Sequence, residues 1–179
     1  MAKPRMSPGT LLPPMAAYVL ENGISGVSLR PLAKAAGTSD RMLIYHFGNR
    51  QGAVDALLEY LSVLFAAGLE QVLPETRAPT RRETAARILA ATNRPELRPF
   101  LRLWWEVVAE AARGNAAFHK SAQSTMRMLL DWLAAHMPED DPDPRGGAKL
   151  LLTLIEGSQM LDAVGCGDIA SEGLRILQE

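Results

Sequence analysis

Residues 28–47 constrain the fold of this chain most strongly, because they carry the start and stop signals of two short helices in close succession. Ser28 is suited to cap the first helix and Gly37 to end it, since serine accepts amide protons at a helix start and glycine adopts the left-handed conformation after a helix. Ser39 is placed to cap a second helix directly afterwards. Two short helices joined by so tight a turn predict a helix-turn-helix motif.

The second of these helices has an inner and an outer face. Leu43 and Phe47 are four residues apart and therefore share one face, which we expect to pack inward. Arg41 and Tyr45 point the other way. A helix that is apolar inside and carries arginine and tyrosine outside fits a recognition helix in the major groove of DNA. Two short helices around a glycine are also common in proteins that bind no DNA, so the motif alone leaves that alternative open.

The whole stretch resembles the N-terminal domain of the TetR family of bacterial transcriptional regulators. The matching elements are Gly37, Leu43, the run Tyr45-His46-Phe47 and the pair Asn49-Arg50. The close resemblance covers about residues 15–65. It implies an all-α fold with an N-terminal three-helix helix-turn-helix domain over residues 1–50 and a C-terminal helical effector-binding and dimerisation domain over residues 51–179. A helix at about residues 49–73 would connect the two.

Three features depart from the family pattern. Ile44 stands where many members have tyrosine, but it can still touch a thymine methyl group. Arg50 replaces a common lysine and keeps its charge. Pro13 and Pro14 fall where the first helix begins in the family, so we expect a short first helix over residues 13–22, with proline at its start.

The motif and the resemblance together predict which side chains face DNA. Arg30 and Arg41 are the candidates for base contacts, because arginine reads guanine O6 and N7 with two hydrogen bonds. Candidates for phosphate contacts, which fix the register on the duplex, are Ser28, Tyr45, His46 and Arg50. The complete predicted DNA-binding set is Ser28, Arg30, Ser39, Asp40, Arg41, Met42, Ile44, Tyr45, His46 and Arg50.

The distribution of charge agrees with a DNA-binding N-terminus. The chain carries a net charge of −1, but residues 1–50 hold six Lys/Arg against Glu21 and Asp40, a net +4, and the remainder a net −5. Positive charge is the electrostatic footprint expected of a nucleic-acid interface. Within this region, residues 1–10 are expected to be either a disordered terminus or a basic arm that touches DNA.

The sequence offers no pattern for catalysis, and we expect neither enzymatic activity nor a cofactor. His46, His119 and His136 lie in no metal-binding spacing, and no serine lies in a nucleophile-elbow pattern. Cys166, the single cysteine, cannot form an internal disulfide, which fits a reducing cytoplasm. No stretch resembles a signal peptide or approaches about 18 consecutive apolar residues, so we expect no membrane partner.

The remainder of the chain reads as a helical body without β-strands. Besides the connecting helix, apolar periodicity and turn signals predict helices over residues 81–92, 95–113, 115–137, 146–165 and 168–178.

Aromatic and methionine side chains in this body are candidates for the wall of a cavity that binds a small apolar or aromatic effector. Residues of this type at helical spacing are also ordinary core or domain-interface residues, and the sequence leaves both interpretations open. The predicted ligand-binding set is Phe100, Trp104, Trp105, Phe118, Met126, Met128, Leu129 and Met160.

The last two helical segments are apolar on more than one side, and this surplus must be buried somewhere. It is buried either within the chain or against another copy. In the TetR family the two C-terminal helices pair with their copies, which implies a homodimer through about residues 146–178. The family resemblance therefore implies a dimeric transcriptional repressor that binds operator DNA and is released from the DNA by an effector. The alternatives are a TetR-like DNA-binding protein that acts through protein partners without an effector, and a small helical enzyme.

Overall fold

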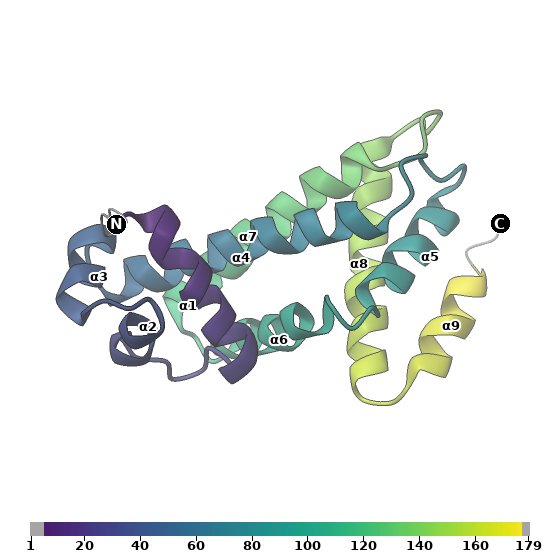
Figure 1. The fold of residues 1–179 in the computed structure, drawn as a ribbon. Helices are drawn as coiled ribbons and strands as arrows, with labels where there is room; N and C mark the ends of the chain where they lie inside the picture. Colours follow the sequence, from purple (N-terminus) through teal and green to yellow (C-terminus); the bar gives the residue numbers. More distant parts are fainter. Residues whose placement is uncertain (1–5, 177–179) are drawn as a thin grey trace. The chain divides into compact units, whose positions relative to one another are not determined.

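The computed structural model describes residues 6–176, and all regular secondary structure in that range is helical (Figure 1). The helices are α1 (Pro8–Asn22), α2 (Leu29–Ala35), α3 (Asp40–Phe47), α4 (Arg50–Val72), α5 (Arg81–Thr92), α6 (Arg98–Ala112), α7 (Ala116–Ala135), α8 (Pro144–Ala163) and α9 (Gly167–Ile176). The predicted all-α fold class is confirmed.

The chain divides into two compact units. The first unit contains the chain as far as Phe65 together with Arg98–Thr125, and the second contains Ala66–Leu97 together with the chain from Met126 onward. Each unit has its own apolar core. The boundary falls within α4 and α7 rather than at the predicted residues 50 and 51, so the predicted functional division stays a prediction.

Helix α1 is longer than predicted, because it begins at Pro8 and not at residue 13. Pro8 occupies the first helical position, where its missing N–H has no helical partner to lose. Pro13 and Pro14 lie inside the helix and withhold two amide donors from the preceding turn. Gly9 and Thr10 in that turn are exposed, so water can reach their carbonyl groups. Of residues 1–10, predicted as a disordered terminus or a basic arm, residues 8–10 are helical. Residues 1–5 lie outside the described residues.

The core of the first unit is built from periodic apolar residues of several helices. Met15, Val19, Leu32, Leu43 and Leu57 have almost no exposed surface. Further along the chain, α6 and α7 add three buried side chains to the same core: Leu103, Val107 and Phe118. The helix-turn-helix segment thus shares its core with two helices that lie far from it in sequence.

Helix α4 matches the connecting helix predicted at residues 49–73. Asn49 caps it, because Asn49 Oδ1 accepts a hydrogen bond from the Gly52 amide at 2.9 Å. Of the described helices, α4 is the one that is long and apolar enough to cross a membrane by length and composition. A buried helix of a globular domain passes the same test, and Leu57 and Leu61 of α4 are buried in the first unit.

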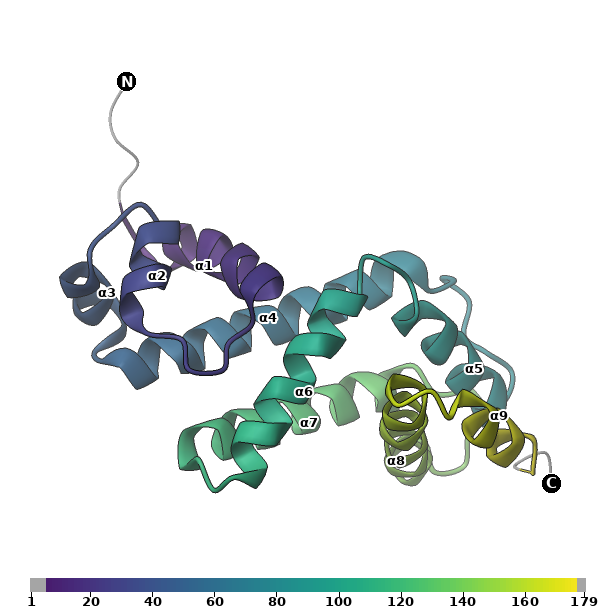
Figure 2. The ribbon, with the colours of Figure 1, turned by 90° about the horizontal axis from the view of Figure 1, so that it is seen from below.

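The later helices were predicted with boundary errors of a few residues. Helix α6 begins at Arg98 rather than at Pro95, which lies in a turn closed by the Leu97 amide and the Arg94 carbonyl at 3.0 Å. Helix α8 begins at Pro144 because Asp143 caps it, accepting a hydrogen bond from the Gly146 amide at 2.9 Å. In the second unit α8 contacts both α5 and α9 (Figures 1 and 2).

Candidate nucleic-acid interface

The turn between α2 and α3 has the predicted glycine geometry. Gly37 has φ +62°, the left-handed region that glycine adopts without strain. Ser39 Oγ then accepts a hydrogen bond from the Met42 amide at 3.4 Å and caps α3. At Ser28 the prediction was wrong, because its side chain makes no capping hydrogen bond to α2. The turn is therefore held by the glycine, by the second cap and by the backbone hydrogen bond from the Thr38 amide to the Ala33 carbonyl at 2.9 Å.

Helix α3 buries one side and presents the other. Leu43 is fully buried, whereas Ile44 is 45% exposed and Tyr45 is 78% exposed. Arg41 is exposed as well and lies three and four residues before these two, so the three side chains share one outward face. An arginine, an aliphatic side chain and a phenol can meet a guanine edge, a thymine methyl group and a phosphate respectively.

The other predicted residues of α3 divide between this outward face and the core. Ser39 and Asp40 are exposed at the start of the helix, and Met42 is half-buried. His46 is also half-buried, and its ring packs edge-on against Tyr45 with centroids 5.1 Å apart. The buried His46 Nε2 atom has no hydrogen-bond partner and faces away from solvent, which disfavours a phosphate contact through that atom.

Arg30 lies on α2 and is therefore not part of the outward face of α3. It lines an open surface depression of about 630 Å³ together with Tyr18, Ser28, Pro31, Lys34 and Ala35. The two cations and the two hydroxyl groups of this depression suit a phosphate group better than a base edge. The sequence prediction missed Lys34, although its position four residues after Arg30 on the same helix could have indicated it.

Arg50 has a structural partner that the sequence did not indicate. Its Nη2 and Nε atoms donate hydrogen bonds to the Val27 carbonyl at 2.6 Å and 3.2 Å. The start of α4 is thereby tied to the segment that precedes α2. The predicted phosphate contact of Arg50 remains a prediction beside this anchoring role.

The predicted effector residues do not form one cluster within either unit. The first unit holds Phe100, Trp104, Trp105 and Phe118, and the second holds Met126, Met128, Leu129 and Met160. Phe118 is buried in the first core, where Phe100 also packs, with its ring centroid 5.8 Å from that of Phe65. Met160 is 53% exposed.

The second unit contains a small pocket that the sequence prediction missed. We call it the α4–α5 pocket: it has a volume of about 140 Å³, and its lining includes Leu73, Thr84, Arg87, Ile88 and His136. None of the predicted effector residues lines it. Within residues 6–176, no group of three or more His, Cys, Asp or Glu side chains is placed to hold a metal ion.

The two C-terminal helices expose apolar side chains, as the sequence predicted. The exposed large apolar residues of α8, α9 and the link between them are Leu150, Met160, Val164, Ile169 and Ile176. No residue of α9 is buried. Since α9 packs against α8 and yet buries no side chain fully, these helices retain an apolar surface that another molecule can cover.

Comparison with known proteins agrees with the predicted resemblance. Residues 17–57 match the family model described as bacterial regulatory proteins, tetR family. The sequence matches no curated protein. The recognised segment covers α2 and α3 and the start of α4, which are the elements that build the candidate interface.

Solved structures share the fold over nearly the whole chain. One is a protein from Rhodococcus sp. assigned to the TetR family of transcriptional regulators, with 23% identity, coverage of 93% of each chain and a TM-score of 0.70. Another is a TetR transcriptional regulator from Legionella pneumophila, with 16% identity, coverage of 98% of this chain and 97% of that chain, and a TM-score of 0.59. A third is the multidrug binding protein EbrR in complex with imidazole, with 21% identity, coverage of 94% and 88%, and a TM-score of 0.64. The fold is that of TetR-family regulators.

Proposed function

We propose that this chain is a TetR-like transcriptional regulator that binds operator DNA as a homodimer and represses transcription until an effector releases it. The observation that carries the proposal is the geometry of α3. A capped helix buries Leu43 and turns Arg41, Ile44 and Tyr45 outward. The match of residues 17–57 to the tetR family supports the same assignment.

Two neighbouring surfaces support binding to double-stranded DNA. The outward face of α3 supplies groups that suit base edges, and the depression around Arg30 and Lys34 supplies groups that suit phosphates. We now assign Arg30 to the phosphate backbone and keep Arg41 as the candidate for a guanine. Phosphate contacts set position and base contacts set sequence preference, so both surfaces are needed for a specific operator.

The homodimer part of the proposal rests on the apolar surface of α8 and α9. Two copies of α3 in a dimer can read successive major grooves, about 34–36 Å apart. A symmetric dimer would therefore bind a palindromic site with half-sites about one helical turn apart. A bacterial regulator that binds operator DNA acts in the cytoplasm, because the chromosome lies there, and we therefore propose a cytoplasmic location.

The effector part of the proposal rests on a helical body larger than DNA binding requires. The α4–α5 pocket is one place for a small molecule, and the predicted residues of the first unit around Trp104 are another. EbrR, which shares the fold, is a multidrug binding protein. If no compound bound the chain, the alternative of a regulator that acts through protein partners would replace this part of the proposal.

The test is selection of bound sequences from a random pool of duplex DNA by the intact protein. We expect enrichment of a palindrome and affinity for it that exceeds affinity for unrelated duplex by about 10³-fold or more. Binding that is weak and equal for all duplexes would contradict a specific regulator. The absence of any binding at low salt would contradict the DNA-binding function altogether.

A further inference from the structure

We propose that Arg102 and Glu106 of α6 are positioning residues for DNA binding. They hold the segment between α1 and α2, and through it the placement of the helix-turn-helix. The inference rests on the proposed operator binding but goes beyond it, since the family match ends at residue 57 and α6 begins at Arg98. All the contacts involved lie within the first unit.

Glu106 holds the backbone directly after α1. Its Oε2 atom accepts hydrogen bonds from the Ile24 amide at 2.7 Å and from the Ser25 amide at 2.9 Å. The charge of the carboxylate makes these bonds stronger than bonds between neutral groups. Ile24 is only 1% exposed, so water cannot readily replace the carboxylate at its amide.

Arg102 holds the last turn of α1. Its Nη2 atom donates hydrogen bonds to the carbonyl groups of Leu20 and Glu21 at 2.5 Å and 3.2 Å. The last carbonyl groups of a helix have no amide partner within the helix, and they form the negative end of its dipole. A guanidinium group satisfies both requirements, so Arg102 fixes the end of α1 relative to α6.

The spacing of these residues places them on one face of α6. Arg102, Glu106 and Glu110 recur every four residues, and Glu110 Oε1 accepts a hydrogen bond from Ser25 Oγ at 3.1 Å. That hydrogen bond is the largest cause of the lowered pKa of Glu110. Leu103 and Val107 of the same helix are buried in the core of the first unit, so α6 is attached by apolar as well as polar contacts.

Gly23 makes room for the carboxylate. Its φ of +83° is a conformation that side-chain-bearing residues rarely adopt. A Cβ atom at this position would lie 2.6 Å from Glu106 Oε1. The backbone can therefore approach Glu106 closely only because residue 23 is glycine.

The opposite end of the segment is held by Arg50. The Val27 carbonyl accepts from Arg50, whereas the Ile24 and Ser25 amides donate to Glu106. A cation on α4 and an anion on α6 thus fix the two ends of the same short segment. Helix α2 begins immediately afterwards at Leu29 and contacts α3, so these anchors set the placement of both helices of the motif.

The effect of Glu106→Gln on operator affinity tests the proposal by its sign. Removal of a negative charge by itself strengthens binding to DNA, because the protein then repels the phosphates less. The glutamine oxygen can still accept from both amides, but without the negative charge these hydrogen bonds are weaker; this loosens the segment before α2 and should weaken operator binding by about tenfold. The matched control is Glu59→Gln, which removes the same charge from an exposed position of α4. Equal or tighter binding by Glu106→Gln than by Glu59→Gln would overturn the proposal.

The salt dependence separates positioning from direct contact. The Glu106 carboxylate is negatively charged and has no proton to donate, so it makes no contact with a phosphate. Glu106→Gln should therefore weaken binding without changing the slope of affinity against salt concentration. Loss of a phosphate contact would change that slope by about one unit. A changed slope would therefore count against a positioning role.

Hydrogen exchange in the intact wild-type protein gives a measurement that needs no variant to fold. In the wild type, the Ile24 and Ser25 amides should exchange about tenfold more slowly than the neighbouring exposed Gly26 amide. Fast exchange of both amides in the wild type would overturn the proposal. If the wild type bound no duplex at all, the proposed function would fail with it, whereas equal binding by wild type and Glu106→Gln would overturn this inference alone.

Discussion

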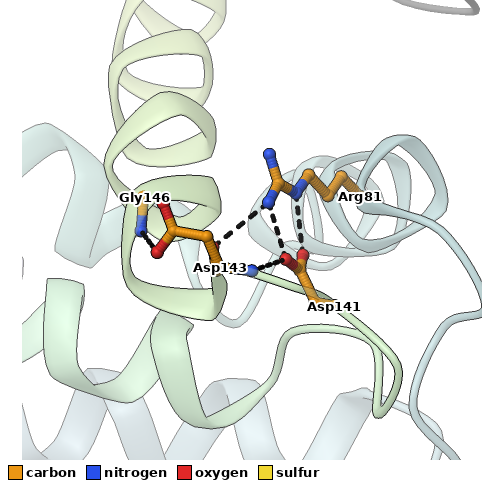
Figure 3. A network of polar contacts seen from close by, with 4 residues as sticks. All are labelled: Arg81, Asp141, Asp143 and Gly146. Atoms are coloured by element: carbon orange, nitrogen blue, oxygen red, sulfur yellow. Dashed lines mark hydrogen bonds and ion pairs between the residues drawn. The ribbon is translucent and has the colours of Figure 1, made fainter.

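Arg81 and Asp141 form a two-pronged ion pair across the second unit (Figure 3). Arg81 Nε donates to Asp141 Oδ2 at 2.7 Å, and Arg81 Nη2 donates to Asp141 Oδ1 at 2.6 Å. The Asp143 amide donates to the same carboxylate at 2.9 Å, and Asp143 in turn caps α8. The pair therefore joins the start of α5 to the start of α8, one of the two helices proposed to form the dimer.

Replacement of Asp141 with Asn should destabilise the protein in a pH-dependent way. The Arg81 guanidinium holds the pKa of Asp141 below its ordinary value. A carboxyl group whose folded pKa is lowered stabilises the fold above its unfolded pKa of about 4, and this contribution is lost as the pH falls through the folded pKa. The difference in melting temperature between wild type and Asp141→Asn should therefore be largest near neutral pH and shrink as the pH falls below the unfolded pKa of about 4. Asp140→Asn, at the exposed neighbouring position, is the control; an equal effect of both variants would contradict the prediction.

Replacement of Arg41 with Ala should cost about 1–3 kcal/mol of operator affinity and relax the preference at one base pair. The reason is the loss of a two-pronged contact with a guanine from the exposed face of α3. Titration of the selected operator and of single-base variants measures both effects. Arg127→Ala, which removes an exposed arginine from α7, is the control for charge alone; an equal loss in the two variants would contradict a base contact.

Arg50→Lys should separate the two roles of Arg50. Lysine keeps the positive charge, but it cannot reproduce the paired donation from Nε and Nη2 to the Val27 carbonyl. If anchoring matters, the lysine variant should bind the operator more weakly with an unchanged salt slope, and Arg50→Ala should in addition flatten that slope by about one unit. If Arg50→Lys bound the operator with wild-type affinity, the anchoring role would be excluded, and the phosphate contact would be the only role left for Arg50.

Val164→Glu and Ile169→Glu should convert the dimer to monomers. The two side chains are 69% and 55% exposed in the single chain, so glutamate costs the isolated subunit little, whereas it places buried charge in a dimer interface. Sedimentation at micromolar concentration reads out the change. Val63→Glu is the control, since Val63 is 58% exposed but lies on α4. A wild-type protein that sediments as a monomer would contradict the dimer.

An apolar or aromatic effector should raise the melting temperature and lower operator affinity together. The two effects are linked, because a ligand that binds both conformations equally shifts neither. A tenfold loss of affinity requires only about 1.4 kcal/mol of coupling. Ile88→Trp fills the α4–α5 pocket and Trp104→Ala alters the predicted site, so the variant that abolishes the response locates the ligand. Compounds that stabilise the protein without affecting the operator would favour regulation through protein partners.

The elements of the helix-turn-helix could be predicted because their signals are local. Gly37, Ser39 and the spacing of Leu43 and Phe47 determine a turn, a cap and a buried face within a few residues. The start of α1 could not be predicted from the same rules. Two interior prolines locally favour a break, but Met15 and Val19 are completely buried, and that packing keeps the helix continuous.

The contacts of α6 could not be predicted, since they join residues more than 80 positions apart in the sequence. Arg102 and Glu106 look like the solvated face of an amphipathic helix until the fold places the end of α1 beside them. The division of the predicted effector residues between two units could not be predicted for a related reason. Apolar periodicity identifies a buried face, but it does not say which of two cores receives it.

Gly23, Arg102 and Glu106 bear on how a regulator of this type can be recombined. In the sequence, the motif resembles a contiguous N-terminal domain that could be fused to a different effector-binding domain. In the structure, α6 contributes to the N-terminal region: Leu103 and Val107 are part of its apolar core, and Glu106 binds the loop that follows α1. A chimera joined directly after the motif would lose these contacts. A functional chimera must therefore include two separate stretches of this chain, the helix-turn-helix region and α6.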